Sequence, residues 1–225
     1  VAIDDGSTDG SGALLTRLAA RDARVVVMHT PALGLVAALN AGLSRCRAKY
    51  IARMDADDES LPGRMEKCAA ALDENPALVA VGTQIEIFRD DRPVSPNMAR
   101  YARWLNSLTS PERLFADRFV ESPLCHPAST IRRDALVRVG GWEDGDFAED
   151  YQLWLKLLEA GGQLMTLPEV LFRWRDREHR LTRTDPRYAL PRMQALKARY
   201  LAKSVLADRR CLIWGAGPHG LSLMR

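Results

Sequence analysis

The sequence predicts an α/β fold of three layers, in which helices cover both faces of a mostly parallel central sheet. Across residues 1–58, short apolar segments alternate with helical segments that carry one apolar face. Carboxylates follow the first and the third apolar segment, as expected where parallel strands end at one edge of a sheet. The chain has 225 residues, 47% hydrophobic and 27% charged, which is enough to bury a sizeable core.

The first part of the chain is predicted to run strand, helix, strand, helix, strand. Residues 1–3, 24–28 and 50–54 are short apolar runs with β-branched or aromatic residues, which favour strands. Between them, residues 11–19 and 35–43 repeat leucine and small residues at helical spacing. A single helix between successive strands predicts that these strands are parallel.

The middle of the chain continues with the same signals. Pro62 is a first-turn proline, and Pro111 divides a longer helical stretch into two pieces. The predicted elements are a helix at 62–72, a strand at 78–88, two helices within 98–119, a strand at 124–131 and a short helix at 134–139.

The C-terminal third begins with a helix. Beyond Glu149, apolar residues recur at i, i+3, i+4 and i+7, and Gly161-Gly162 ends the pattern. Residues 163–174 suggest two short strands around Pro168, and a helix from about 186 to 206 follows.

Composition excludes several classes of protein. The net charge of +3 is too small to indicate nucleic-acid binding. No apolar run approaches the roughly 20 residues that span a bilayer. The cysteines form no CxxC pair, so buried reduced thiols are expected rather than a zinc site. They are Cys46, Cys68, Cys125 and Cys211.

Three acids follow the third predicted strand: Asp55, Asp57 and Asp58. Carboxylates this close repel one another unless a cation, water or hydrogen-bond donors compensate their charge. Hard oxygen ligands at this spacing suit Mg²⁺ or Mn²⁺, which keep phosphate oxygens and waters among their ligands. The alternative is a solvated acidic turn, and for Asp4 and Asp5 after the first strand it is a helix-capping turn.

Taken in order, three motifs resemble the family 2 glycosyltransferases with the GT-A fold. The first is Val1-Ala2-Ile3-Asp4-Asp5-Gly6-Ser7-Thr8-Asp9-Gly10-Ser11. The second is Leu39-Asn40-Ala41-Gly42 leading to Asp55-Ala56-Asp57-Asp58. The third is Glu149-Asp150 before Tyr151-Gln152-Leu153-Trp154. The resemblance covers about residues 1–185 and implies a GT-A-like fold.

The resemblance implies a nucleotide-diphosphate sugar as the donor, usually a uridine one, with Mn²⁺ or Mg²⁺ on its diphosphate. Asp57 corresponds to the direct metal ligand. Asp55 would face the ribose or a metal-bound water, so it is expected both in metal binding and in donor binding. Asp58 would support these two acids. Asp5 corresponds to the acid that pairs with the uracil ring, and Asp4 is expected beside it in donor binding.

The resemblance also implies inverting transfer, with Asp150 as the base that takes the proton of the acceptor hydroxyl. Glu149 would orient the acceptor or raise the basicity of Asp150 by repulsion. The alternative is that both are first-turn acids that the helix dipole stabilises. His126, in Cys125-His126-Pro127, corresponds to an acceptor-side histidine, although a core or capping histidine fits equally. His179 with Arg175 resembles a family element near the diphosphate. The alternative is that both belong to a solvated basic loop.

Two departures from the family matter. The family opens with one more strand, so residues 1–185 are expected to be a GT-A domain without its first strand. Such a domain would either re-pair its strands or keep a marginal, water-filled gap. The processive members carry Gln-x-x-Arg-Trp, but here Val170 precedes Arg173-Trp174, which favours transfer of a single sugar.

The end of the chain is predicted to divide into a helical linker at 186–208 and the start of a truncated Rossmann-like domain at 209–225. Gly215, Gly217 and Gly220 follow an apolar run in the dinucleotide-binding pattern, although a chance glycine turn is the alternative. A nucleotide- or NAD-binding module is therefore a competing function, and a non-catalytic GT-A fragment is another.

The partners follow from the resemblance. The acceptor would be a glycan or a lipid-diphosphate-linked sugar of bacterial surface polysaccharide synthesis, and no nucleic acid is expected. Six arginines between 173 and 187 could contact an anionic acceptor or membrane headgroups, or could be a solvated charged linker. The expected location is the cytoplasm, with peripheral contact at the inner face of the plasma membrane.

Overall fold

In the computed structural model the described residues are 1–207, 209–210, 212 and 217. The N-terminal elements are β1 (Ala2–Asp5), α1 (Ser11–Arg21), β2 (Val27–Thr30), α2 (Leu35–Arg45), β3 (Tyr50–Ala52), β4 (Glu59–Ser60), α3 (Arg64–Glu74) and β5 (Leu78–Phe88). The predicted dinucleotide-binding pattern and the strand before it depend on residues outside this described part.

The second half continues from the long strand β5. Its elements are α4 (Pro96–Ser107), α5 (Pro111–Asp117), the 3-10 helix η1 (His126–Ala128), β6 (Thr130–Arg132), α6 (Arg133–Arg138), α7 (Glu149–Glu159), β7 (Gln163–Arg175), α8 (Leu181–Thr184), the 3-10 helix η2 (Pro186–Tyr188) and α9 (Leu190–Lys203). None of the described helices is long and apolar enough to cross a membrane.

The α/β class is confirmed, but the prediction of a mostly parallel sheet is wrong. The larger sheet has the order β3-β6-β5-β7-β4, and within it only β5 and β7 pair in parallel. The connection from β5 to β6 contains two helices, α4 and α5, instead of the single helix of a parallel crossover. β6 runs antiparallel to both β3 and β5. Strand direction depends on the path of the segments that connect the strands, and the apolar periodicity of a sequence does not indicate this path.

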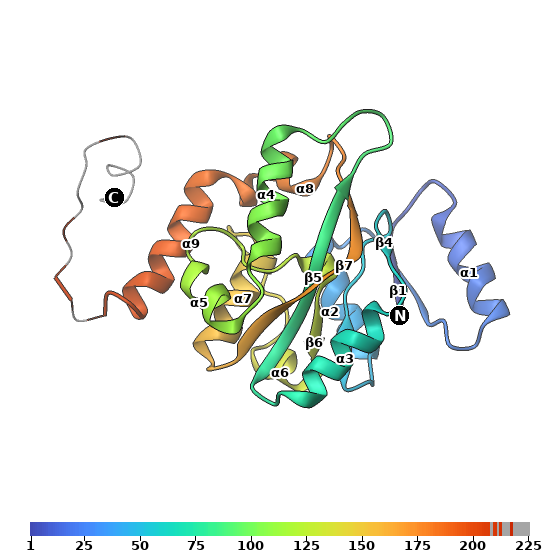
Figure 1. Ribbon diagram of the computed structural model, residues 1–225. Helices are drawn as coiled ribbons and strands as arrows, with labels where there is room; N and C mark the ends of the chain where they lie inside the picture. The colour runs from blue at the N-terminus through green and yellow to red at the C-terminus, as the bar shows by residue number, and fades with distance from the viewer. Residues whose placement is uncertain (208, 211, 213–216, 218–225) are drawn as a thin grey trace.

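Helices lie on both faces of the larger sheet, with β5 and β7 through its centre (Figure 1). On one face, α3 packs Cys68 and Leu72 against Leu78 and Val81 of β5. The opposite face of β5 carries residues of the main core. That core includes Ala80, Ile85 and Ile87 of β5, Leu105 of α4, Leu114 of α5 and Leu153 of α7. Both faces are covered because β5 carries apolar side chains on each of them, and register shifts after Leu78 and after Thr83 interrupt the simple alternation.

Local sequence signals explain several element boundaries. Ser95 and Ser110 cap α4 and α5, each accepting a hydrogen bond of 3.3 Å from a main-chain amide, and a proline follows each cap. At 163–174 the structure has one strand, β7, rather than two. A register shift between Leu167 and Val170 places Pro168 in an irregularity, where a missing amide costs no ladder bond.

Two further strand and helix predictions needed correction. Of the predicted strand at 124–131, only the end is extended, because η1 occupies His126–Ala128 with Pro127 in its first turn. The predicted helix from 186 to 206 is interrupted: η2 ends at Tyr188 and α9 begins at Leu190. Pro186 and Pro191 each lie near the start of one of these helices.

Strands β1 and β3 belong to separate sheets. β1 pairs in parallel with β2, and Figure 1 shows this pair with α1 beside the larger sheet. A cavity of about 1170 Å³ separates the two sheets and is lined by Val1–Ile3 on one side and Tyr50–Met54 on the other. The strands thus keep a gap instead of re-pairing. That the domain lacks its first strand stays a prediction.

Candidate functional site

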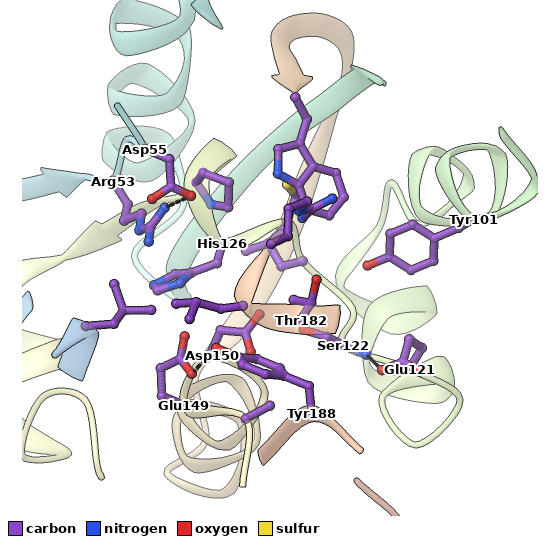
Figure 2. A pocket seen from close by; sticks show the side chains of 18 of the residues that line it. Arg53, Asp55, Tyr101, Glu121, Ser122, His126, Glu149, Asp150, Thr182 and Tyr188 are labelled. Carbon is purple, nitrogen blue, oxygen red and sulfur yellow. Dashed lines mark hydrogen bonds and ion pairs between the residues drawn. The ribbon is translucent and has the colours of Figure 1, made fainter. Parts of the chain in front are cut away.

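A second cavity, of about 470 Å³, lies where the end of β3, η1, the N-terminus of α7 and the segment after β7 meet. Figure 2 shows His126 between Arg53 and Asp55 on one side and Glu149 and Asp150 on the other. We call this space the active-site cavity. It is lined by Leu35, Arg53, Asp55, Asp57, Tyr101, Glu121, Ser122, Leu124, Cys125, His126, Pro127, Ala148, Glu149, Asp150, Trp174, Arg175, Arg180, Leu181, Thr182, Tyr188, Leu190 and Met193.

Asp55 and Asp57 both line the active-site cavity, and each is paired with an arginine. Asp55 forms an ion pair with Arg53, whose side chain is buried. Asp57 lies 3.2 Å from Nε of Arg177. The two arginines offset the mutual repulsion of these acids at the cavity wall.

Asp58 lies behind these two acids and does not line the cavity. Its Oδ1 accepts a hydrogen bond of 2.8 Å from the main-chain amide of Arg175, while its buried Oδ2 has no hydrogen-bond partner among the described residues. Burial raises the pKa of Asp58 to about 7, and the neighbouring charges of Asp55 and Asp57 add to the shift. Asp58 therefore joins the acidic turn to the end of β7.

The predicted divalent cation can be tested against this donor set. Among the described residues, no group of three or more His, Cys, Asp or Glu side chains could hold a metal ion by itself. Asp55 and Asp57 supply two accessible carboxylates at the cavity wall. Two carboxylates suit Mg²⁺ or Mn²⁺ when substrate phosphates complete the coordination. The residues therefore fit an ion that binds together with a diphosphate.

Glu149 and Asp150 occupy the first turn of α7 and also line the cavity. Oδ1 of Asp150 accepts a hydrogen bond of 2.7 Å from the amide of Tyr151. Burial raises the pKa of Asp150 to about 7, and the negative charge of Glu149 contributes to the shift. Glu149 is 2% exposed and accepts a hydrogen bond of 2.6 Å from the hydroxyl of Tyr188.

His126 is buried at the floor of the cavity and is held by Trp142. The indole Nε1–H of Trp142 lies 2.9 Å from Nε2 of His126, so this ring nitrogen is the acceptor and Nδ1 carries the proton. Burial holds the pKa of His126 well below its usual range, with a smaller contribution from Arg53. Asn40 of α2 anchors the main chain of Trp142 through bonds of 2.8 and 3.1 Å. His126 is thus a fixed, neutral side chain.

Asp4 and Asp5 lie outside the active-site cavity. Asp4 is buried and accepts hydrogen bonds of 3.0 Å from the amide of Ser7 and from His29. Asp5 lines the larger cavity between the two sheets. Its carboxylate accepts from the hydroxyl of Thr30 and from two amides of the loop before α2, at 2.7–2.8 Å. In this structure both acids organise local turns, and their predicted donor-binding roles stay predictions.

The six arginines from 173 to 187 are all paired within the chain. Their acidic partners are Glu59 and Glu86 for Arg173, Asp90 for Arg175, Asp57 for Arg177, Asp176 for Arg180 and Arg183, and Asp185 for Arg187. These pairs neutralise much of the charge that a membrane surface would attract. They favour a role in holding this segment against the cavity, and the predicted membrane contact stays untested.

Several residues that line the cavity are not among the predicted site residues. Arg53 precedes the acids in the sequence, and an arginine beside three aspartates was an available signal. Tyr101, Thr182 and Tyr188 reach the cavity from α4, α8 and η2, which are far apart in the sequence. No local pattern marks them, because only the tertiary fold brings them together.

Comparison with known proteins identifies the family of this chain. Residues 1–140 match glycosyl transferase family 2. The amylovoran biosynthesis glycosyltransferase AmsE of Erwinia amylovora is 32% identical over 176 residues, 78% of this chain and 63% of AmsE. The putative glycosyltransferase EpsE of Bacillus subtilis is 31% identical, covering 83% of this chain and 66% of EpsE. An Escherichia coli enzyme named UDP-Gal:alpha-D-GlcNAc-diphosphoundecaprenol beta-1,3-galactosyltransferase is 29% identical, covering 72% and 57%. The chain spans 57% to 66% of these three relatives.

Solved structures show the same fold at lower sequence identity. The mannosyltransferase PcManGT of Pyrobaculum calidifontis, solved with GDP-Man and Mn²⁺, gives a TM-score of 0.58 at 18% identity, over 98% of this chain and 56% of that one. TarS residues 1–349 of S. aureus, solved with UDP-GlcNAc, gives 0.59 at 17% identity, over 89% and 56%. The fold is that of the GT-A glycosyltransferases, and the chain belongs to glycosyl transferase family 2.

Proposed function

We propose that the chain carries the active site of an inverting glycosyltransferase that moves one sugar from a nucleotide-diphosphate sugar, a UDP-sugar, to an acceptor hydroxyl. One observation supports this above all others. A single cavity has Asp55 and Asp57 in one wall and the Glu149–Asp150 pair in another, which is the division between a leaving group and a base that a single displacement needs.

In this mechanism the diphosphate of the donor binds at Asp55 and Asp57, together with Mn²⁺ or Mg²⁺. When bound, such an ion supplies Lewis-acid stabilisation of the departing diphosphate. Arg175 and Arg180 line the same cavity and add positive charge near the leaving group. Asp58 supports the acidic turn from behind through the amide of Arg175.

Asp150 acts as the general base. Its pKa of about 7 suits a group that must accept a proton near neutral pH. As the acceptor oxygen attacks the anomeric carbon, its proton passes to Oδ of Asp150, and the bond from that carbon to the diphosphate oxygen breaks. The anomeric configuration inverts because attack comes from the face opposite the leaving group. Neutral His126 offers Nδ1–H to the acceptor or sugar at the floor of the cavity.

The acceptor we propose is a glycan or a lipid-diphosphate-linked sugar of bacterial surface polysaccharide synthesis. Support comes from the printed names of relatives, among them an amylovoran biosynthesis glycosyltransferase and an enzyme acting on a GlcNAc-diphosphoundecaprenol. The reaction would take place on the cytoplasmic side of the membrane, where the UDP-sugar is available.

Thermal shift separates this function from the competing ones. UDP with Mn²⁺ is expected to raise the melting temperature, because a ligand of the native state stabilises by mass action, and NAD is not. Asp57→Asn should abolish the UDP–Mn²⁺ shift. Asp22→Asn is the matched control, since Asp22 is an exposed aspartate paired with Arg24 at 2.7 Å. A shift with NAD alone would favour the nucleotide-binding alternative, and no shift with either would favour a non-catalytic domain.

A further inference from the structure

Tyr188 reaches the acidic pair, Glu149 and Asp150, from the segment 186–208 that is predicted to be a helical linker. It is the last residue of η2, and its hydroxyl donates a hydrogen bond of 2.6 Å to Oε2 of Glu149 (Figure 2). Within the described part of the chain, no other hydrogen bond to this carboxylate is found. Glu149 is 2% exposed, and a carboxylate so deeply buried stays ionised only with a donor or a cation beside it.

The position of Tyr188 is built by the turn that precedes it. Asp185 accepts a hydrogen bond of 2.9 Å from the amide of Arg187 and pairs with its guanidinium at 2.8 and 3.0 Å. The same guanidinium lies 3.3 Å from Asp144 in the loop before α7. Tyr188 also packs against the cluster formed by α7 and α9. The tyrosine is therefore held in place before any substrate binds.

Several charged and titratable side chains face Glu149 and Asp150. Asp150 is faced by Glu149 on its own helix, by Arg53 from the end of β3, and by Glu121 from the loop after α5. Tyr101 of α4 and Tyr188 of η2 also face it. Burial and the charge of Glu149 raise the pKa of Tyr188, so its hydroxyl keeps its proton and remains a donor. Arg187 is the cation that faces Glu149 from η2.

We propose that Tyr188 is a positioning residue for this pair: its hydroxyl holds the Glu149 carboxylate in a fixed orientation beside Asp150 and thereby keeps Asp150 a stronger base. This inference rests on the proposed role of Asp150. The hydroxyl stabilises the negative charge on Glu149, and that charge makes the proton of Asp150 harder to remove. Without the donor, the Glu149 side chain would lose its fixed position, and its carboxylate would act less strongly on Asp150.

The test is a pH titration of the side-chain carboxyls by ¹³C NMR in the unliganded protein, with Asp150→Asn and Glu149→Gln assigning the signals. Tyr188→Phe should lower the midpoint of Asp150 from about 7 by about one pH unit or more. Tyr200→Phe is the matched control, because Tyr200 is a buried tyrosine of the same α7–α9 cluster and makes no bond to Glu149. It should leave the midpoint unchanged.

Glu149→Gln gives a second route, because glutamine keeps an oxygen for the Tyr188 hydroxyl while removing the charge. It should lower the Asp150 midpoint as Tyr188→Phe does, and the double variant should match Glu149→Gln alone, since both changes act through one carboxylate. An unchanged or raised midpoint in Tyr188→Phe would overturn the inference. So would additive shifts in the double variant. A structural role alone would lower stability without moving the midpoint.

Turnover separates this inference from the proposed function. If Asp150 is the base, the acidic limb of kcat/KM in Tyr188→Phe should move to lower pH and the plateau should fall. Near-normal kcat in Asp150→Asn would defeat the proposed function, whatever the titrations show. A normal titration response with no such change in the rate profile would overturn the link between Tyr188 and catalysis.

Discussion

Arg64 of α3 donates a hydrogen bond of 2.7 Å to the main-chain carbonyl of Arg53, directly after the strand that leads to the acidic turn. The same nitrogen also lies 3.0 Å from the carbonyl oxygen of Pro127 and 3.3 Å from that of Ser129. Arg64 is 1% exposed, and its guanidinium lies 4.8 Å from the ring centre of Phe172. A single buried cation therefore joins the end of β3 to the loop that forms the cavity floor.

Arg64→Met is expected to lower the free energy of unfolding by at least about 2 kcal/mol, because it leaves buried carbonyls without their charged donor. Denaturant unfolding measures the loss. Arg113→Met is the control, since Arg113 forms an exposed i,i+4 pair with Asp117 and should lose less than about 1 kcal/mol. Equal losses in the two variants would show that Arg64 does not tie these segments together.

Asp150→Asn should lower kcat by about 10²-fold or more, with little change in donor affinity. In the native enzyme the acidic limb of kcat/KM should lie near pH 7, because burial and Glu149 raise the pKa of Asp150 to about 7 and protonation removes the base. Stopped assays across pH 5–9 check both expectations. A rate that keeps its native value in the variant would transfer the role of base to another residue.

The same pKa predicts how stability changes with pH. A folded-state pKa raised above the unfolded value means that the native state holds the proton more tightly. This contribution is present below about pH 4 and is lost as pH rises toward 7. Asn cannot ionise, so Asp150→Asn should gain melting temperature relative to the native chain as pH rises from 4 to 8. A difference that is constant with pH would contradict the shifted pKa.

Asp176 anchors the segment that carries Tyr188. Its carboxylate is 3% exposed and lies 3.1 Å from Arg89, 3.5 Å from Arg180 and 2.7 Å from Arg183. Asp176→Asn should lower stability by about 3–5 kcal/mol, because it removes a buried charge that three arginines share.

Hydrogen exchange in the Asp176→Asn variant should increase across residues 181–188, with a smaller increase elsewhere. Asp134→Asn is the matched control, as Asp134 forms an exposed pair with Arg138 at 3.5 Å. If both variants unfold at the same denaturant concentration as the native chain, Asp176 is not the anchor of this segment.

Much of the fold could be predicted from the sequence because its signals are local. The two serine–proline pairs start α4 and α5, and the stripe after Glu149 gives α7 its buried face. The strand β5 has the predicted bounds, 78–88. Each of these features depends on residues within one or two turns of each other, so a single sequence contains the information.

The remainder depends on contacts between distant segments. The direction of β6, the short strand β4 and the pairing of β1 are set by how elements pack. Among the site residues, Asp55, Asp57, Glu149 and Asp150 line one cavity, and the roles that their motifs imply stay predictions. The contacts of Asp5 with the loop before α2 and of Tyr188 with Glu149 could not be predicted, because nothing local specifies a partner tens of residues away.

Strand β1 is expected to be less protected from hydrogen exchange than β5. It pairs with β2 on one edge, and its other edge faces the cavity of about 1170 Å³, whereas β5 is paired on both edges. Amides of Ala2–Asp5 should therefore exchange much faster than those of Leu78–Phe88 in hydrogen-exchange mass spectrometry. Equal protection of the two strands would show that β1 does without a second neighbour.

The anomeric configuration of the first product is the most direct test of inverting transfer, because a single displacement inverts this configuration. With water as the acceptor, no glycan is needed, and ¹H NMR can follow an α-linked UDP-sugar with Mg²⁺, which is diamagnetic, before the released sugar equilibrates. We expect that the β-anomer forms first and that Asp150→Asn slows its formation. Release of the α-anomer first would contradict inversion, and with it the role given to Asp150.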